Sequence, residues 1–228
     1  MSLFRQLYDE DSSTLSYLIA DADTQDAVMI DPVLGQHQRD LKLIETLGLK
    51  LRYIVETHVH ADHVTGAGRL REATGARVAV GAAADVSCAD IQIADGARLA
   101  FGKEHLSAMA TPGHTRGCTS YRWHDRVFTG DTLLIGGCGR TDFQQGNAGQ
   151  LYDSLQRLLA LSDETLVYPG HDYAGRRVSC IGEERTLNSR IAGQDREAFV
   201  ALMEGLSLPY PRHIDEALPA NQACGRLA

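Results

Sequence analysis

The sequence predicts an α/β fold in which helices pack on the outside of two stacked sheets. Strand and helix patterns alternate near both ends of the chain, and the middle consists mostly of short strands. No internal repeat, low-complexity segment or linker-like composition divides the 228 residues. Helices outside two sheets would bury the apolar face of every element. We therefore expect a single domain over residues 1–228, with a short irregular tail from about residue 208.

The first third of the chain has the pattern of strands that alternate with helices. Residues 14–30 show apolar alternation around a polar turn, which is typical of a hairpin, and residues 36–47 have helical apolar spacing. Gly48 follows as a helix stop. Further along, the pattern predicts strands at 51–55 and 77–80 and a helix from Asp62 to about Thr74.

The middle of the chain predicts short strands, and helices return after it. Gly, Asp and Pro residues separate the apolar runs, as expected for turns between strands. The predicted strands are 98–101, 106–110, 119–123, 126–129 and 165–168. The predicted helices are 147–161, 178–191 and 196–206.

Composition and charge exclude several classes of function. A net charge of -8 without a basic stripe argues against a nucleic-acid surface. No apolar run approaches the roughly 20 residues that span a bilayer, and the first residues do not resemble a signal peptide. The five cysteines are scattered, which predicts free thiols in a reducing, cytoplasmic compartment rather than a disulfide framework. The sequence leaves a homodimer open.

A dense group of potential metal ligands follows the predicted strand at 51–55. The stretch 57–63, THVHADH, holds three imidazoles and one carboxylate, and three further candidates follow later strands beside glycines. Loops at strand ends are where sites are commonly built, and these ligand types suit zinc, iron or manganese. The seven candidates are His58, His60, Asp62, His63, His114, Asp131 and His171.

Residue types alone give seven potential ligands, a number that predicts a site for two metal ions. Such a site generates a hydroxide for hydrolysis. In that interpretation Asp131 bridges the two ions. One ion is held by His58, His60 and His114, and the other by Asp62, His63 and His171.

The motifs THxHxDH, TPGHT, GDT and PGH, in this order between about residues 12 and 191, resemble those of the metallo-β-lactamase superfamily. The resemblance implies an αββα sandwich of two mixed sheets with helices outside. Two subfamilies share these motifs: dinuclear glutathione thiolester hydrolases (glyoxalase II) and mononuclear persulfide dioxygenases (ETHE1-like sulfur dioxygenases). The stretch GCGRTDFQQG at 137–146 is similar to the dioxygenase pattern, as are His171-Asp172-Tyr173 and the stretch 183–190, in which Ser189 stands where the family often has Pro.

The dioxygenase resemblance implies one Fe(II) per chain, held by His58, His114 and Asp131. Two histidines and one carboxylate leave three positions open around iron. The remaining four candidates would then orient ligands and waters. These are His60, Asp62, His63 and His171.

The implied reaction oxidises glutathione persulfide with O₂ and water to glutathione and sulfite. The two carboxylates of glutathione need cationic partners, for which Arg140 and Arg190 are candidates. Tyr173 is a catalytic or substrate-binding hydroxyl donor near the iron, and Cys138 is a candidate for the pocket wall. Two alternatives stay open: a dinuclear glutathione thiolester hydrolase and a non-enzymatic metal or redox sensor.

Overall fold

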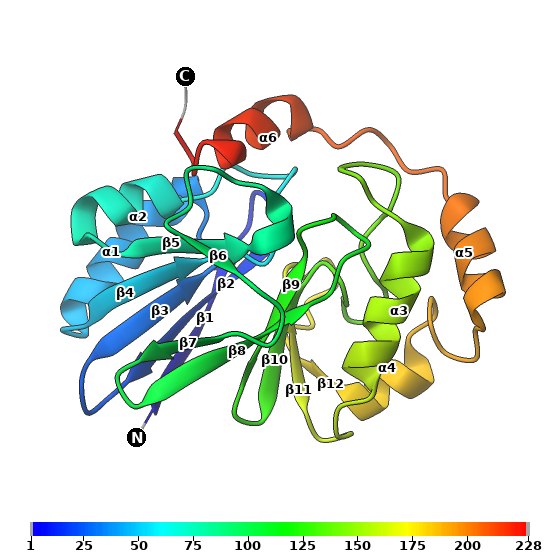
Figure 1. Cartoon of the computed structure of the whole chain (residues 1–228), viewed down its shortest axis with the longest axis horizontal. Helices are drawn as coiled ribbons and strands as arrows, with labels where there is room; N and C mark the ends of the chain where they lie inside the picture. The colour runs from blue at the N-terminus through cyan, green and yellow to red at the C-terminus, as the bar shows by residue number, and fades with distance from the viewer. Residues whose placement is uncertain (1, 227–228) are drawn as a thin grey trace.

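A computed structural model describes residues 2–226, in which two six-stranded sheets stack face to face (Figure 1). The first sheet has the order β1-β2-β3-β4-β5-β6, antiparallel from β1 to β3 and parallel from β3 to β6. Its strands are β1 (Ser2–Asp9), β2 (Thr14–Asp21), β3 (Asp26–Ile30), β4 (Lys50–Val55), β5 (Arg77–Gly81) and β6 (Ile91–Ile93).

The second sheet has the order β12-β11-β10-β9-β8-β7, and only β10 and β11 pair in parallel. Its strands are β7 (Arg98–Phe101), β8 (Glu104–Ala110), β9 (Thr119–Trp123), β10 (Arg126–Gly130), β11 (Leu166–Pro169) and β12 (Ser179–Cys180). The two mixed sheets confirm the predicted α/β sandwich.

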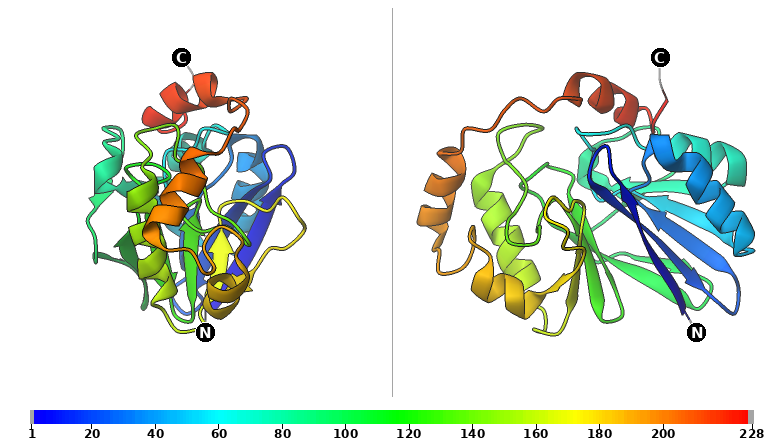
Figure 2. Two further views of the ribbon diagram at one scale, coloured as in Figure 1. Left: turned by 90° about the vertical axis from the view of Figure 1, so that its right-hand side faces the viewer. Right: turned by 180° about the vertical axis from the view of Figure 1, so that it is seen from behind.

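Helices cover the outer face of each sheet (Figures 1 and 2). One apolar cluster lies between the sheets, a second between the first sheet and its helices, and a third between the second sheet and its helices. The first sheet carries α1 (His37–Thr46), preceded by the short η1 (Leu34–Gln36), and α2 (Ala67–Thr74), while η2 (Ala82–Ala84) follows β5. The second carries α3 (Ala148–Leu159), α4 (Ile181–Leu187) and α5 (Arg196–Glu204).

Most predicted elements are confirmed within a few residues, but three predictions are wrong. The helix expected from Asp62 begins at Ala67, because the backbone of the preceding loop bonds to distant parts of the chain instead of to itself. In the segment 178–191, where one helix is expected, Ser179–Cys180 form β12 and the helix α4 covers only Ile181–Leu187. The tail is not irregular throughout, because it ends in α6 (Ile214–Gln222).

The segment between α5 and α6 crosses from the outside of the second sheet to the first (Figures 1 and 2). We call residues 205–226, which include α6, the C-terminal strap. Cys224 in the strap forms a disulfide with Cys88, which lies before β6. The expectation of free thiols is therefore wrong for this pair, because folding brings together two cysteines that are 136 residues apart. Cys118, Cys138 and Cys180 remain free thiols.

None of the helices found in residues 2–226 is both long enough and apolar enough to cross a membrane.

Candidate functional site

The loops that follow β4, β8, β10 and β11 bring all seven predicted side chains to one end of the two sheets. The potential ligand atoms of His58, His114 and Asp131 lie within 4.8 Å of one another. Those of His60, Asp62 and His63 form a second such group. His171 connects the two groups through hydrogen bonds to both aspartates.

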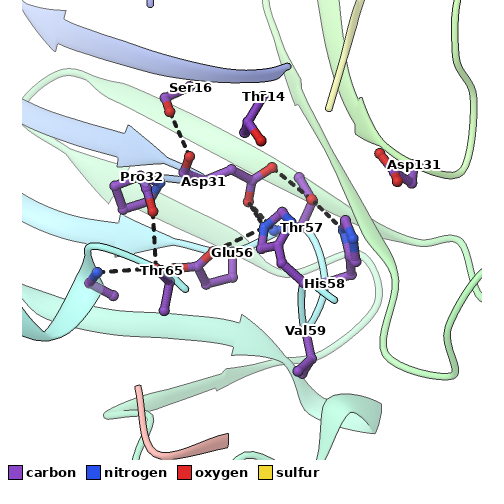
Figure 3. Close-up of polar contacts among 12 residues, drawn as sticks. Thr14, Ser16, Asp31, Pro32, Glu56, Thr57, His58, Val59, Thr65 and Asp131 are labelled. Carbon is purple, nitrogen blue, oxygen red and sulfur yellow. Dashed lines mark hydrogen bonds and ion pairs between the residues drawn. The ribbon is translucent and has the colours of Figure 1, made fainter. Parts of the chain in front are cut away.

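In both His58 and His114, Nδ1 takes part in a hydrogen bond, which leaves Nε2 as the ring nitrogen available to a metal. The Thr57 hydroxyl donates to Asp31 at 2.7 Å, so it accepts from His58 Nδ1 at 3.0 Å (Figure 3). His114 Nδ1 donates to the carbonyl oxygen of Arg140 at 2.7 Å. A histidine that donates from one ring nitrogen keeps the lone pair of the other for a metal. The hydrogen bonds therefore fix the tautomer that metal binding requires.

Asp131 supplies a carboxylate oxygen beside these two nitrogens. Its Oδ1 accepts from His171 Nδ1 at 2.7 Å, and its Oδ2 lies 3.8 Å from His114 Nε2. Burial disfavours the charge of this carboxylate, but His171, with His58 and His114, holds the pKa of Asp131 well below its usual value. Two imidazole nitrogens and one carboxylate oxygen match the facial triad of mononuclear iron sites. The residues present therefore fit a single divalent metal.

His60, which the two-metal interpretation assigns to the first ion, has its Nε2 directed elsewhere. That nitrogen lies 3.3 Å from both Asp31 Oδ1 and Glu56 Oε2. Burial disfavours the imidazolium, yet these two carboxylates raise the pKa of His60 well above its usual value. His60 Nε2 thus lies between two buried carboxylates at ion-pair distance, and neither ring nitrogen of His60 has a hydrogen-bond partner among the residues that the structure describes.

In the second group, Asp62 Oδ2 lies 2.8 Å from His63 Nδ1 and also 2.9 Å from His171 Nε2. The buried His60 Nδ1 and His63 Nε2 have no hydrogen-bond partner in the described part of the chain. Although burial opposes it, the carboxylates of Asp131 and Asp62 raise the pKa of His171 well above its usual value. With both ring nitrogens donating, His171 orients the two carboxylates and has no lone pair free.

A pocket of about 270 Å³ opens beside the first group. Asp131, His114 and His171 lie at its base, and the strap contributes Leu208 and Pro211 to its wall. Three of the four predicted substrate contacts line it, namely Arg140, Cys138 and Tyr173.

Arg190, the fourth, is not among the lining residues of this pocket. Its Nη1 lies 3.5 Å from the sulfur of Met203, which also contacts the thiol of Cys138. A role for Arg190 in substrate binding stays a prediction.

Arg140 attaches the metal-site loop to the strap. Its guanidinium forms two hydrogen bonds of 2.6 Å with Asp142, and Nη1 donates to the carbonyl oxygen of Pro209 at 2.8 Å. The same group lies 4.7 Å over the ring of Phe143. Its backbone carbonyl also accepts from His114, so Arg140 contacts both the metal site and the pocket wall.

Tyr173 and Cys138 provide contrasting surfaces in the pocket. The Tyr173 ring stacks parallel to His171 at 5.5 Å, and the residue is 73% exposed at the pocket mouth. Cys138 is buried, and burial raises the pKa of its thiol to about 12. The thiol therefore stays neutral and offers an apolar contact rather than a nucleophile.

Three residues in the site were not predicted: Asp31, Glu56 and Asn221. Asp31 and Glu56 each directly follow a predicted strand, so the strand-end rule that found the histidines could have found them. Asn221 lies in the strap and bonds to the loop after β4 from 158 residues away. No local pattern in the sequence marks that contact.

Comparison with known proteins agrees with this geometry. Residues 9–171 match the model of the metallo-beta-lactamase superfamily. The persulfide dioxygenase ETHE1 of Homo sapiens is 47% identical over 98% of this chain and 89% of its own length. The crystal structure of ETHE1 from Myxococcus xanthus is 55% identical, covers 98% of this chain and 100% of its own, and has a TM-score of 0.96.

A hydroxyacylglutathione hydrolase of Cereibacter sphaeroides is 40% identical over 72% of this chain and 64% of its own length. The chain is thus more similar to the two dioxygenases than to this hydrolase, and its similarity to the dioxygenases extends through the strap. The chain belongs to the metallo-beta-lactamase superfamily and, within it, to the persulfide dioxygenase family.

Proposed function

We propose that this enzyme is a glutathione-dependent persulfide dioxygenase with one Fe(II) per chain. It oxidises glutathione persulfide with O₂ and water to glutathione and sulfite. The observation that carries the mononuclear proposal is the engagement of His60 and His171. A two-metal site would need both side chains as ligands, whereas here His60 Nε2 lies 3.3 Å from Asp31 and Glu56, and His171 pairs with Asp62 and Asp131.

We propose His58, His114 and Asp131 as the residues that hold the iron. Bound iron would supply the one-electron chemistry through which O₂ reacts with a sulfur anion. The hydrogen bond from His171 fixes the orientation of Asp131, and Asp62 in turn fixes His171. Such outer contacts commonly contribute 10–100-fold to metal affinity or activity.

The pocket walls suit a thiol peptide with two carboxylates. Arg140 provides a guanidinium next to the metal site, with Asp142 and the strap fixing its orientation. Tyr173 provides an exposed hydroxyl and ring at the mouth, and Cys138 a neutral apolar surface near the base. We propose that these three residues contact the glutathione part of the substrate, with Arg190 as a further candidate.

Oxygen consumption tests this proposal directly. The purified enzyme should consume O₂ with glutathione persulfide and form sulfite, and it should not hydrolyse S-lactoylglutathione. Hydrolysis of the thiolester without oxygen uptake would instead establish the dinuclear hydrolase. That alternative is kept because His60, Asp62 and His63 still lie close enough to share an ion. A sensor without turnover would show neither reaction.

We further propose a cytoplasmic location and retain the single-domain interpretation and the homodimer as predictions. The Cys88–Cys224 disulfide requires an oxidant, so in a reducing compartment it would form only under oxidising conditions. Trapping of thiols in intact cells, followed by a gel-shift assay, measures which state is present.

A further inference from the structure

The loop after β4 is held at several of its backbone carbonyl oxygens by partners from elsewhere in the fold. The carbonyl oxygens of Thr57, Val59 and Val64 accept from Thr119, Gln144 and Leu34, respectively. The stretch between Val59 and Val64 contains Asp62 and His63 and has no regular secondary structure. Its fixation therefore depends on contacts with distant residues.

Asn221 provides those contacts. Its Nδ2 donates to the carbonyl oxygens of His60 and His63, each at 2.8 Å, and its Oδ1 accepts from the Thr65 amide at 2.8 Å. Asn221 is 6% exposed. Within residues 2–226 no other donor reaches either carbonyl oxygen. One buried side chain thus uses three of its hydrogen-bonding positions to close the loop.

The helix that carries Asn221, α6, has low intrinsic stability, so its position depends on packing. α6 has nine residues with Pro219 inside it, and Pro removes a helical hydrogen bond. Its end instead packs tightly onto the loop and α2. A Cβ at Gly68 would stand 2.8 Å from the carbonyl oxygen of Cys224, and one at Gly225 would stand 2.2 Å from that of Thr65. The end of the strap is therefore in close backbone contact with α2 and the loop.

We infer that Asn221 is a positioning residue for the metal centre, acting through the loop backbone. The contacts run from Asn221 to the His60–His63 backbone, from Asp62 to His171, and from His171 to Asp131. Asn221 lies outside residues 9–171, which the superfamily model matches. The strap thus completes a site whose metal ligands all come from the matched region. This inference rests on the proposed metal site.

The test compares Asn221→Ala with two control variants in the full chain. Gln222→Ala changes the adjacent exposed residue, and Cys88→Ser breaks the disulfide while leaving Asn221 in place. The rate at which each iron-loaded protein releases iron to a chelator is measured. Asn221→Ala should release iron about 10-fold faster or more, and both controls should stay within about 2-fold of the wild type. Equal release by Asn221→Ala and wild type would overturn the inference.

Equal acceleration by Asn221→Ala and Cys88→Ser would also overturn it, because general attachment of α6 would then explain the effect. Should Asn221→Ala not fold, Asn221→Asp is tested in its place. This variant keeps the acceptor for the Thr65 amide but replaces the amide donor to the two carbonyl oxygens with a carboxylate oxygen, which cannot donate. Faster iron release by this folded variant supports the inference, and wild-type release contradicts it.

Hydrogen exchange of the metal-free proteins separates this inference from the proposed function. The Thr65 amide should be protected in the wild type and should exchange at least about 10-fold faster in Asn221→Ala, which lacks its acceptor. A wild-type protein that binds no iron would refute the proposed function, while this measurement would still test the role of Asn221. Unchanged exchange in Asn221→Ala would refute that role.

Discussion

His171 Nδ1 lies 2.7 Å from Asp131 Oδ1, while the other ring nitrogen of His171 lies 2.9 Å from Asp62 Oδ2. The histidine thus bridges a candidate metal ligand and a residue that a second metal would need. In a dinuclear site both contacts would have to give way to metal bonds. Here they orient Asp131 and engage Asp62, and the proposal of one ion rests on these contacts.

Asp131→Ala should abolish iron binding and dioxygenase activity. The change removes the anionic ligand and leaves two neutral imidazoles, and we expect affinity to fall by more than about 100-fold. Titration of the metal-free protein with Fe(II) under anaerobic conditions measures the loss. Asp23→Ala, a change of an exposed aspartate far from the site, is the matched control. A variant that still holds one iron per chain would exclude Asp131 as a ligand.

His171→Ala should weaken iron binding by about 10–100-fold without removing a ligand. Asp131 would lose the donor that orients it, and Asp62 would lose one of its hydrogen-bond partners. His171→Gln should recover part of the affinity, because an amide can donate one of these hydrogen bonds. An effect of His171→Ala as large as that of Asp131→Ala would instead indicate direct ligation.

Arg140→Ala should raise KM for glutathione persulfide by about 10–100-fold, the range of one lost charge-assisted hydrogen bond. The value of kcat should change less, because the His114 contact uses the backbone of Arg140 rather than its side chain. Steady-state oxygen uptake measures both constants, and Arg52→Ala is the control, since it removes an exposed ion pair with Asp26. An unchanged KM would remove Arg140 from the substrate site.

Cys88→Ser should lower the free energy of unfolding by about 3–5 kcal/mol, because the disulfide closes a loop longer than 100 residues. Chemical denaturation of oxidised wild type, reduced wild type and the variant gives the comparison. Reduced wild type and Cys88→Ser should agree. Cys180→Ser, which changes a free thiol, should leave the denaturation midpoint of the oxidised protein nearly unchanged.

The contribution of Asp40 to the free energy of unfolding should fall as pH rises from about 4 to about 6. Burial raises the pKa of this carboxyl to about 6, although Arg39 acts in the opposite direction. The folded state therefore binds the proton more tightly than the unfolded state, and stability falls as pH rises from the unfolded pKa through the folded one. The effect reaches about 3 kcal/mol when the shift is converted at 1.36 kcal/mol per pH unit. Asp40→Asn should flatten this part of the curve of unfolding free energy against pH.

The sequence predicted the architecture and the seven clustered side chains because both follow from local patterns. Strand alternation places His58, His114 and Asp131 at strand ends, and glycines flank the later loops. It could not predict how those side chains divide their hydrogen bonds. The proposal of one metal rests in part on Asp31 and Glu56 lying near His60, which is a property of packing.

The strap escaped prediction for the same physical reason. A short helix with Pro219 has weak intrinsic propensity, and it forms because its partners lie far away in the chain. Asn221 and Cys224 make contacts over more than 130 residues. Composition suggested free thiols, and only the fold shows that Cys88 and Cys224 meet.

The most direct test of the mononuclear centre is the metal content of the enzyme purified without added metal. Element analysis by mass spectrometry, normalised to protein concentration, should give about one iron per chain and little zinc, in agreement with the facial triad. Two zinc ions per chain would contradict the account, because His60 and His171 would then have to release their carboxylate partners and bind metal.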